Sequence, residues 1–103
     1  MMKLNSKNNL LLQIEKIKRR NKKNIDNNLQ IDSKNLYVYY DIFYQNKIDI
    51  ISYYTKIMEY NTQTNILYIT KNKYSRTTTI QQNKIIDNFI KYNNSKIIYT
   101  NQF

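Results

Sequence analysis

Apolar residues near the start of the chain recur with the period of an amphipathic helix. The pattern predicts a helix over residues 10–23, with Asn8 or Asn9 able to cap its start. The apolar positions of this helix are Leu10, Leu11, Ile14 and Ile17. Residues 24–35, which are rich in Asn and Asp, predict a linker after the helix.

Aromatic and β-branched residues dominate the middle of the chain and predict three strands. The expected strands are residues 36–44, 48–60 and 66–70. The second is longer than a usual strand, so a bend is expected within it. Turns are predicted at residues 45–47 and 61–65, and Asn46 is expected to take a positive φ where glycine would normally serve.

A capped amphipathic helix is predicted after the third strand. Thr78 with Gln81, or Thr79 with Gln82, matches a capping box, in which a hydroxyl and an amide satisfy backbone donors reciprocally. The apolar stripe of this helix is expected to lie on the sheet. Its members are Ile80, Ile85, Ile86, Phe89 and Ile90.

Two asparagines at residues 93–94 are expected to end this helix, and residues 96–100 either add an edge strand or trail away. Together the elements predict an α+β fold: an antiparallel sheet of three or four strands, one capped C-terminal helix packed on it, and an N-terminal basic helix or arm. For a chain of 103 residues, we expect one small α+β domain, residues 36–103, preceded by the basic helix and linker, residues 1–35.

The composition excludes several kinds of chemistry. The chain has no Gly, Pro, Cys, His or Trp and is rich in Ile, Lys, Asn and Tyr, all of which have A- and T-rich codons. Thiolate nucleophiles, Ser–His pairs, tetrahedral zinc sites and glycine-rich phosphate loops therefore cannot form. We expect a protein that is not an enzyme and has no cofactor or metal. The carboxylates Asp41, Asp49, Glu59 and Asp87 are expected to form salt bridges with nearby lysines.

Basic residues are in excess, with 17 Lys and Arg against 7 Asp and Glu and a formal net charge of +10. Glutamate also has an A-rich codon, yet only Glu15 and Glu59 occur, so codon bias explains only part of the excess. This charge favours nucleic acid or an acidic protein surface as the partner, with solubility alone as the alternative. The candidate phosphate-binding residues are Lys16, Lys18, Arg19, Arg20, Lys22, Lys23, Lys71, Lys73 and Arg76.

Residues 74–79 (YSRTTT) place hydroxyls and a guanidinium at the start of the second predicted helix. They suit either an anion site, bordered by Lys71 and Lys73, or an ordinary helix cap. The tyrosines leave a similar choice open, between a base-stacking platform interleaved with Lys47 and Lys56 and half-buried positions in a sheet. The platform candidates are Tyr37, Tyr39, Tyr53, Tyr54, Tyr60 and Tyr68.

Short motifs rich in Ser, Thr and Tyr occur at residues 52–57 (SYYTKI), 67–70 (LYIT) and 74–79 (YSRTTT), followed by Asn83 and Phe89. In these motifs the chain resembles a small uncharacterised domain that is common in bacteriophage genomes. Where that family usually has a histidine, this chain has Gln81 or Gln82. The resemblance spans residues 51–92 and implies a phage or mobile-element origin, with no catalytic residues.

The sequence therefore predicts a small binding protein that contacts nucleic-acid phosphates through its basic arm and the 71–76 loop. The alternatives are a protein–protein interaction module, such as an inhibitor of a host nucleic-acid enzyme, and a structural subunit of a larger assembly. No apolar run is long enough to span a bilayer. We therefore expect no membrane partner and a cytoplasmic location, in the host cell if a phage encodes the chain.

Overall fold

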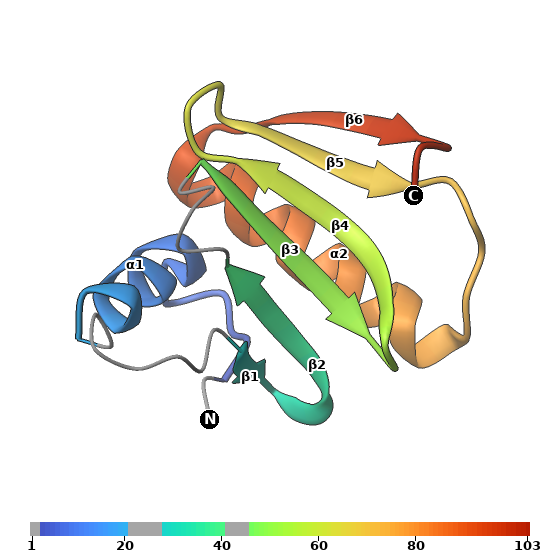
Figure 1. Cartoon of the computed structure of the whole chain (residues 1–103), viewed down its shortest axis with the longest axis horizontal. Helices are drawn as coiled ribbons and strands as arrows, with labels where there is room; N and C mark the ends of the chain where they lie inside the picture. The colour runs from blue at the N-terminus through green and yellow to red at the C-terminus, as the bar shows by residue number, and fades with distance from the viewer. Residues whose placement is uncertain (1–2, 21–27, 41–45) are drawn as a thin grey trace.

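One six-stranded sheet with two helices on the same face makes up the described part of the chain, residues 3–20, 28–40 and 46–103 of a computed structural model (Figure 1). In chain order the elements are α1 (Leu10–Arg20), β1 (Asn28–Ile31), β2 (Ser33–Tyr40), β3 (Lys47–Ser52), β4 (Thr55–Asn61), β5 (Ile66–Thr70), α2 (Arg76–Asn93) and β6 (Lys96–Thr100). The expected α+β class is confirmed, but three or four strands are too few.

The strands lie in the sheet in the order in which they occur along the chain. Neighbours from β1 to β5 are antiparallel, as expected. β5 and β6 are parallel, and α2, which runs behind the sheet in Figure 1, is the crossover that a parallel pair requires. The strand expected over residues 66–70 is thus confirmed as β5, and of the two alternatives for residues 96–100 the structure has the edge strand, β6. The expectation of a purely antiparallel sheet is wrong at β6.

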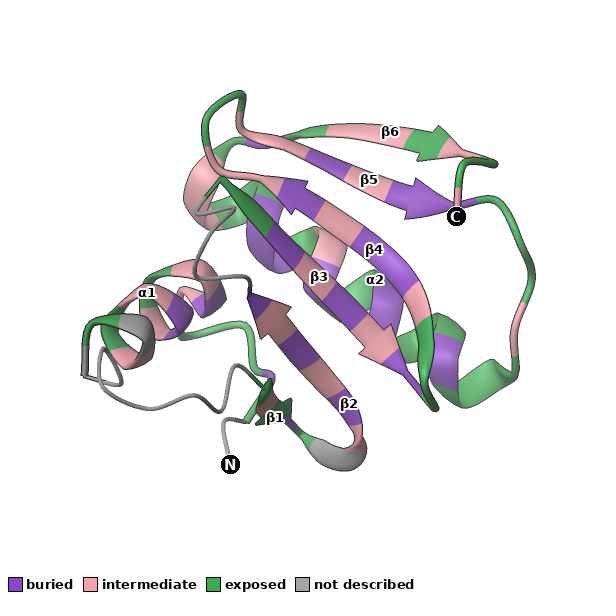
Figure 2. Ribbon diagram, in the orientation of Figure 1, coloured by how far each residue is buried: buried purple, intermediate pink, exposed green. Residues whose placement is uncertain are grey.

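Alternate residues of the strands point to the helix-covered face and form one core (Figure 2). In β3, for example, Ile48, Ile50 and Ser52 are buried, whereas the residues between them are not. Leu10 and Ile14 of α1 belong to the same cluster of buried side chains. Burying one such aliphatic side chain stabilises a fold by about 1.5–3 kcal/mol. Helix α1 is therefore packed on the domain, and the alternative of an extended basic arm is wrong for this segment.

The boundaries in the N-terminal third differ from those expected. Helix α1 is described as far as Arg20, and the last three residues of the expected helix lie outside the described residues. The linker expected over residues 24–35 is wrong where it is described, because residues 28–31 form β1 and β2 begins at Ser33. The sequence did not predict β1 because this strand has only four residues, of which only the last is buried, so it shows no alternating apolar pattern. Residues 41–45, at the end of the expected first strand, lie outside the described residues.

The long strand expected over residues 48–60 is instead a hairpin of β3 and β4. Only Tyr53 and Tyr54 separate the two strands, which pair antiparallel. Both residues have a positive φ, 48° for Tyr53 and 68° for Tyr54, as the tight type I′ hairpin turn requires. Asn46, for which a positive φ is expected from the sequence, does not have one.

Helix α2 is capped at both ends. The hydroxyl of Ser75, the N-cap, accepts a hydrogen bond from the backbone N–H of Thr78 at 3.3 Å. The expected capping boxes beginning at Thr78 or Thr79 are therefore wrong, because Thr78 already lies inside the helix with its side chain buried. At the other end Asn94 takes the left-handed conformation and ends the helix, as expected.

The inner face of α2 is partly polar. Ile85 and Phe89 of the expected apolar stripe are buried, whereas Ile80 and Ile90 are exposed. The buried polar side chains of the helix are Thr78, Gln81, Gln82 and Asn88. Packing of apolar side chains therefore accounts for only part of this inner face. Thr78 and Asn88 form side-chain hydrogen bonds there, whereas Gln81 Oε1 and Gln82 Nε2 have no hydrogen-bond partner among the described residues.

Asn88 joins the N-terminal segment to α2. Its side-chain oxygen accepts from the backbone N–H of Leu10 at 2.9 Å, and its amide nitrogen donates to the carbonyl oxygens of Asn5 at 3.1 Å and Asn8 at 2.7 Å. Asn9 also caps α1, as expected, by accepting from a backbone N–H one turn later at 3.3 Å. One buried side chain of α2 thus holds the segment that leads into α1.

Candidate functional site

Three of the expected basic residues lie around the start of α2: Lys71 and Lys73 on the β5–α2 loop, and Arg76 as the first residue of the helix. Lys71, Lys73 and Arg76 are exposed there, and none forms an ion pair with any described residue. Cations that have no acidic partner in the fold are available to an external anion, because no internal pair has to be broken first. The expected cluster at this loop is therefore present and accessible.

The expected basic residues of α1 do not join this loop. Lys16 and Arg19 are exposed on α1, where Lys18 and Arg20 also lie, while Lys22 and Lys23 are outside the described residues. Figure 1 shows α1 and the β5–α2 loop at opposite ends of the molecule. The expected sites thus form two separate basic regions.

A hollow of about 380 Å³ lies between the β3–β4 hairpin and the start of α2. Its lining residues are Ser52, Tyr53, Thr55, Ile57, Tyr74, Ser75 and Thr78. Two of them, Tyr74 and Ser75, belong to the basic loop. At the helix start the hydroxyl of Ser75 donates to the hydroxyl of Thr78 and accepts from the backbone N–H of Thr78. The ordinary cap that the sequence allowed here is therefore confirmed.

The hairpin tip next to this hollow is held in a costly conformation. A positive φ costs an L-residue with a side chain roughly 1–2 kcal/mol, and two-residue turns of this type normally contain Asn and Gly. Tyr53 and Tyr54 take it although their side chains are 56% and 93% exposed, so burial does not compensate for the strain. The backbone N–H of Tyr53 donates to the carbonyl of Asn35 at 2.9 Å, which ties the tip to β2.

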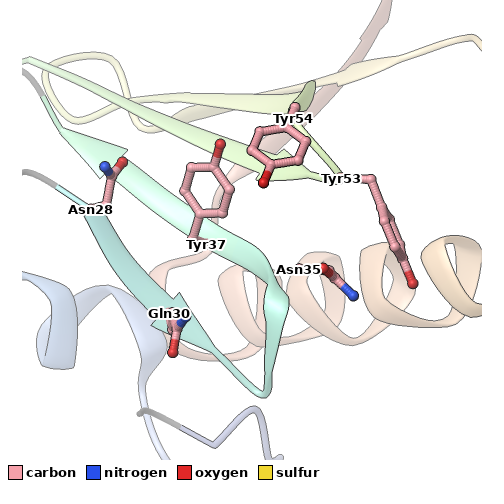
Figure 3. Close-up of a pocket in the computed structure, with 6 residues that line it drawn as sticks. All are labelled: Asn28, Gln30, Asn35, Tyr37, Tyr53 and Tyr54. Atoms are coloured by element: carbon pink, nitrogen blue, oxygen red, sulfur yellow. The ribbon is translucent and has the colours of Figure 1, made fainter.

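A second hollow, of about 260 Å³, lies on the other side of the hairpin tip (Figure 3). It is lined by Asn28, Gln30, Asn35, Tyr37, Tyr53 and Tyr54. Figure 3 shows Tyr54 leaning back towards Tyr37, while Tyr53 points away from both. The described residues of the lining are all aromatic or carry a side-chain amide. Tyr53 borders both hollows and therefore connects them.

The other tyrosines are less suited to contact a ligand. Tyr60 is buried, its ring lies 4.7 Å from that of Phe89, and its hydroxyl donates to Asn65 at 2.7 Å. Burial raises the pKa of Tyr60. Tyr39 and Tyr68 are half-buried on the open face of the sheet. Of the expected platform residues, Tyr60 is thus a core residue, and Tyr37, Tyr53 and Tyr54 are gathered at one hollow.

Four charged side chains form a neutral cluster on the open face. Asp49 and Glu59 lie opposite each other on β3 and β4, and Lys56 contacts both, at 3.1 Å and 2.5 Å. Lys47 approaches Glu59 to 3.3 Å. Although burial disfavours the charged forms, these contacts hold the pKa of Lys56 above and that of Glu59 below its ordinary value. The expected salt bridges are confirmed for Asp49 and Glu59.

The other two carboxylates of the sequence analysis are not part of this cluster. Asp87 is exposed on α2, and Asp41 lies outside the described residues. Within the described ranges, no three acidic side chains gather in a way that would hold a metal ion. No helix of the described residues is long and apolar enough to cross a membrane.

The sequence analysis did not select Gln30 and Asn35, although both line the second hollow. Both fall in the segment that is expected to be a linker, and an amide in a linker carries no signal of its own. The only signal at the hairpin tip was the unusual length of the expected strand over residues 48–60, and that length predicted a bend and not a turn at Tyr53 and Tyr54.

The chain matches no protein-family model, and no curated protein or solved structure is significantly similar to it. The resemblance to the phage-associated domain thus remains a prediction that rests on the three motifs alone.

Proposed function

We propose that this chain is a small non-enzymatic protein of phage or mobile-element type that binds nucleic acid by contacting its phosphates. The observation that supports the proposal best is the β5–α2 loop, where Lys71, Lys73 and Arg76 are exposed and unpaired within the described residues. Lys and Arg contacts to phosphates provide affinity and position, without reading the sequence.

The distribution of charge also supports the proposal. The cluster of Lys47, Lys56, Asp49 and Glu59 is neutral, so the rest of the chain carries the whole formal net charge of +10. The excess of base therefore lies outside the internal ion pairs. Such a field attracts polyanions and accelerates their encounter with the protein.

The test is fluorescence anisotropy of labelled single-stranded DNA, duplex DNA and RNA with the full chain, at about 50 mM and about 200 mM salt. We expect binding that weakens with salt and differs little between sequences. Lys71→Ala, Lys73→Ala and Arg76→Ala combined should flatten the plot of log affinity against log salt by about 2 for a single strand, since each phosphate contact contributes about 0.7.

A control with the same change in net charge replaces Lys3, Lys7 and Lys96, which are exposed elsewhere. It should alter the salt dependence much less. No binding at low salt would refute the proposal and direct the search to an acidic protein surface, as in an inhibitor or an assembly subunit. Equal losses in both triple variants would refute the assignment to the loop.

A further inference from the structure

The two tyrosines of the hairpin tip are not explained by folding or by composition. The turn places Tyr53 and Tyr54 in a conformation that glycine or asparagine adopts more readily, and it leaves both side chains largely exposed. The chain lacks glycine, but asparagine is abundant and takes a positive φ at Asn65 and Asn94. Strained residues that the core does not require are a sign of a functional role.

The hollow beside the tip has the size and chemistry for one small planar group. Its volume of about 260 Å³ lies below the roughly 300–1,000 Å³ typical of pockets for drug-sized molecules. Tyr37 and Tyr54 offer ring faces, and Tyr53 continues the aromatic border. The described lining residues carry aromatic rings and amides, which suit a planar group that can stack and form hydrogen bonds.

Two amides provide hydrogen-bonding groups at this hollow. The side chains of Gln30 and Asn35 line it and make no hydrogen bond with any other described residue. An amide carries both donors and an acceptor, which match the edge of a nucleobase. Aromatic rings that stack on a base, combined with polar groups at its edge, are the usual means by which proteins bind unpaired bases.

The basic loop lies on the other side of the same tip. Tyr53 lines the first hollow together with Tyr74 and Ser75, which are neighbours of Lys73 and Arg76 in the chain. The aromatic hollow, which can hold a base, and the cationic surface, which can contact phosphates, therefore adjoin at Tyr53. A nucleotide strand has this combination of neutral planar groups and regularly spaced negative charges.

We propose that the hollow lined by Tyr37, Tyr53 and Tyr54 receives one unstacked base of a single-stranded nucleic acid, with Gln30 and Asn35 at the edge of the base and the neighbouring phosphates on the Lys71–Arg76 loop. This inference rests on the proposed function and adds to it a preference for single strands. A base inside a duplex is stacked on both faces and paired along one edge, so it cannot enter the hollow.

The test compares two fluorescent strands of about eight nucleotides, a length within the site sizes of single-strand binders. One carries natural bases, and the other has abasic sugars throughout with the same phosphates. We expect the natural strand to bind roughly 5- to 100-fold more tightly, the range for stacking of one base on an aromatic ring. Duplex DNA should behave like the abasic strand.

Substitutions at the hollow test whether it causes the preference for the natural strand over the abasic strand. Tyr54→Gly and Tyr37→Ala should each remove most of the difference between the strands while leaving the salt dependence unchanged, whereas Tyr54→Phe should keep it. The matched control is Tyr99→Ala, because Tyr99 is 57% exposed but lies on β6. Its preference for the natural strand should equal that of the wild-type protein.

The outcomes separate this inference from the proposed function. If both strands bind equally and with the same salt dependence, the proposed binding of a base in the hollow is refuted, whereas the proposed phosphate binding is not. A preference for natural bases that survives Tyr54→Gly and Tyr37→Ala would overturn this location. Failure to bind either strand at low salt would overturn both proposals.

Discussion

Replacing Tyr54 with glycine should make the protein more stable, which is unusual for the loss of an aromatic side chain. The substitution relieves a left-handed conformation at φ 68° that costs roughly 1–2 kcal/mol. Glycine gives back about 0.5–1 kcal/mol through its greater freedom in the unfolded chain. The ring is 93% exposed, so at 25 cal/mol per Å² the lost burial is at most about 0.4 kcal/mol. The expected net gain is about 0.5 kcal/mol, or roughly 2–4 °C in Tm.

Thermal and urea unfolding of the full chain would measure this gain. The control is Tyr99→Gly, since Tyr99 is also exposed but lies in a regular strand where glycine has no strain to relieve. That variant should lose about 0.5–1 kcal/mol or more. If Tyr54→Gly lowers Tm as much as Tyr99→Gly does, the turn is not strained and the argument for a functional hairpin tip loses its basis. A variant that is more stable and binds less well would instead show a trade-off between stability and function.

Four further predictions concern side-chain contacts that stabilise the fold. Asn88→Asp replaces the amide that donates to two carbonyl oxygens with a carboxylate that repels them, so it should lower the free energy of unfolding by about 2–4 kcal/mol. The control is Asn83→Asp, exposed on the same helix, which should change the free energy of unfolding by less than about 0.5 kcal/mol. Ser75→Ala removes the N-cap of α2 and should cost about 1 kcal/mol in urea unfolding, with Thr77→Ala, exposed in the same turn, as the control. The lowered pKa of Glu59 contributes stability that is present above the ordinary glutamate pKa and lost as the pH falls through the lowered one, and Glu59→Gln should flatten this part of the acid unfolding profile, while Asp87→Asn should not. The raised pKa of Lys56 acts in the opposite direction: its contribution is present below the ordinary lysine pKa and lost as the pH rises through the raised one, so Lys56→Met should remove it.

The C-terminal half of the fold could be predicted from the sequence because its local signals agree with one another. Residues 66–70 and 96–100 are apolar runs bounded by polar turns, and both are strands. Helix α2 has the expected end at Asn94, where a residue that tolerates positive φ follows a long amphipathic pattern. Its start was predicted too late, since three consecutive threonines offer several equivalent caps and the serine before them forms the bond.

The hairpin could not be predicted because its turn contradicts the usual turn chemistry. A tight turn is expected at Gly, Asn or Asp, and Tyr53 and Tyr54 have a high preference for strands. β1 gave no signal because a single buried residue, Ile31, does not make a pattern. The same difference applies to the candidate site. The exposed cations around the β5–α2 loop could be predicted from the sequence. The second hollow could not, because it is formed by the hairpin turn and β1, for which local propensities give no signal.

The contact between Asn88 and the chain around α1 has a consequence for biosynthesis. Leu10 and Asn88 are separated by 78 positions, so α1 leaves the ribosome long before the residue that caps it. At about 5–20 residues per second, the interval is roughly 4–16 s. A helix of 11 residues is only marginally stable alone in water, and its apolar side chains remain uncovered during that time. The nascent chain therefore presents a short basic and apolar segment, a typical binding site for chaperones, until α2 is complete and the N-terminus can dock.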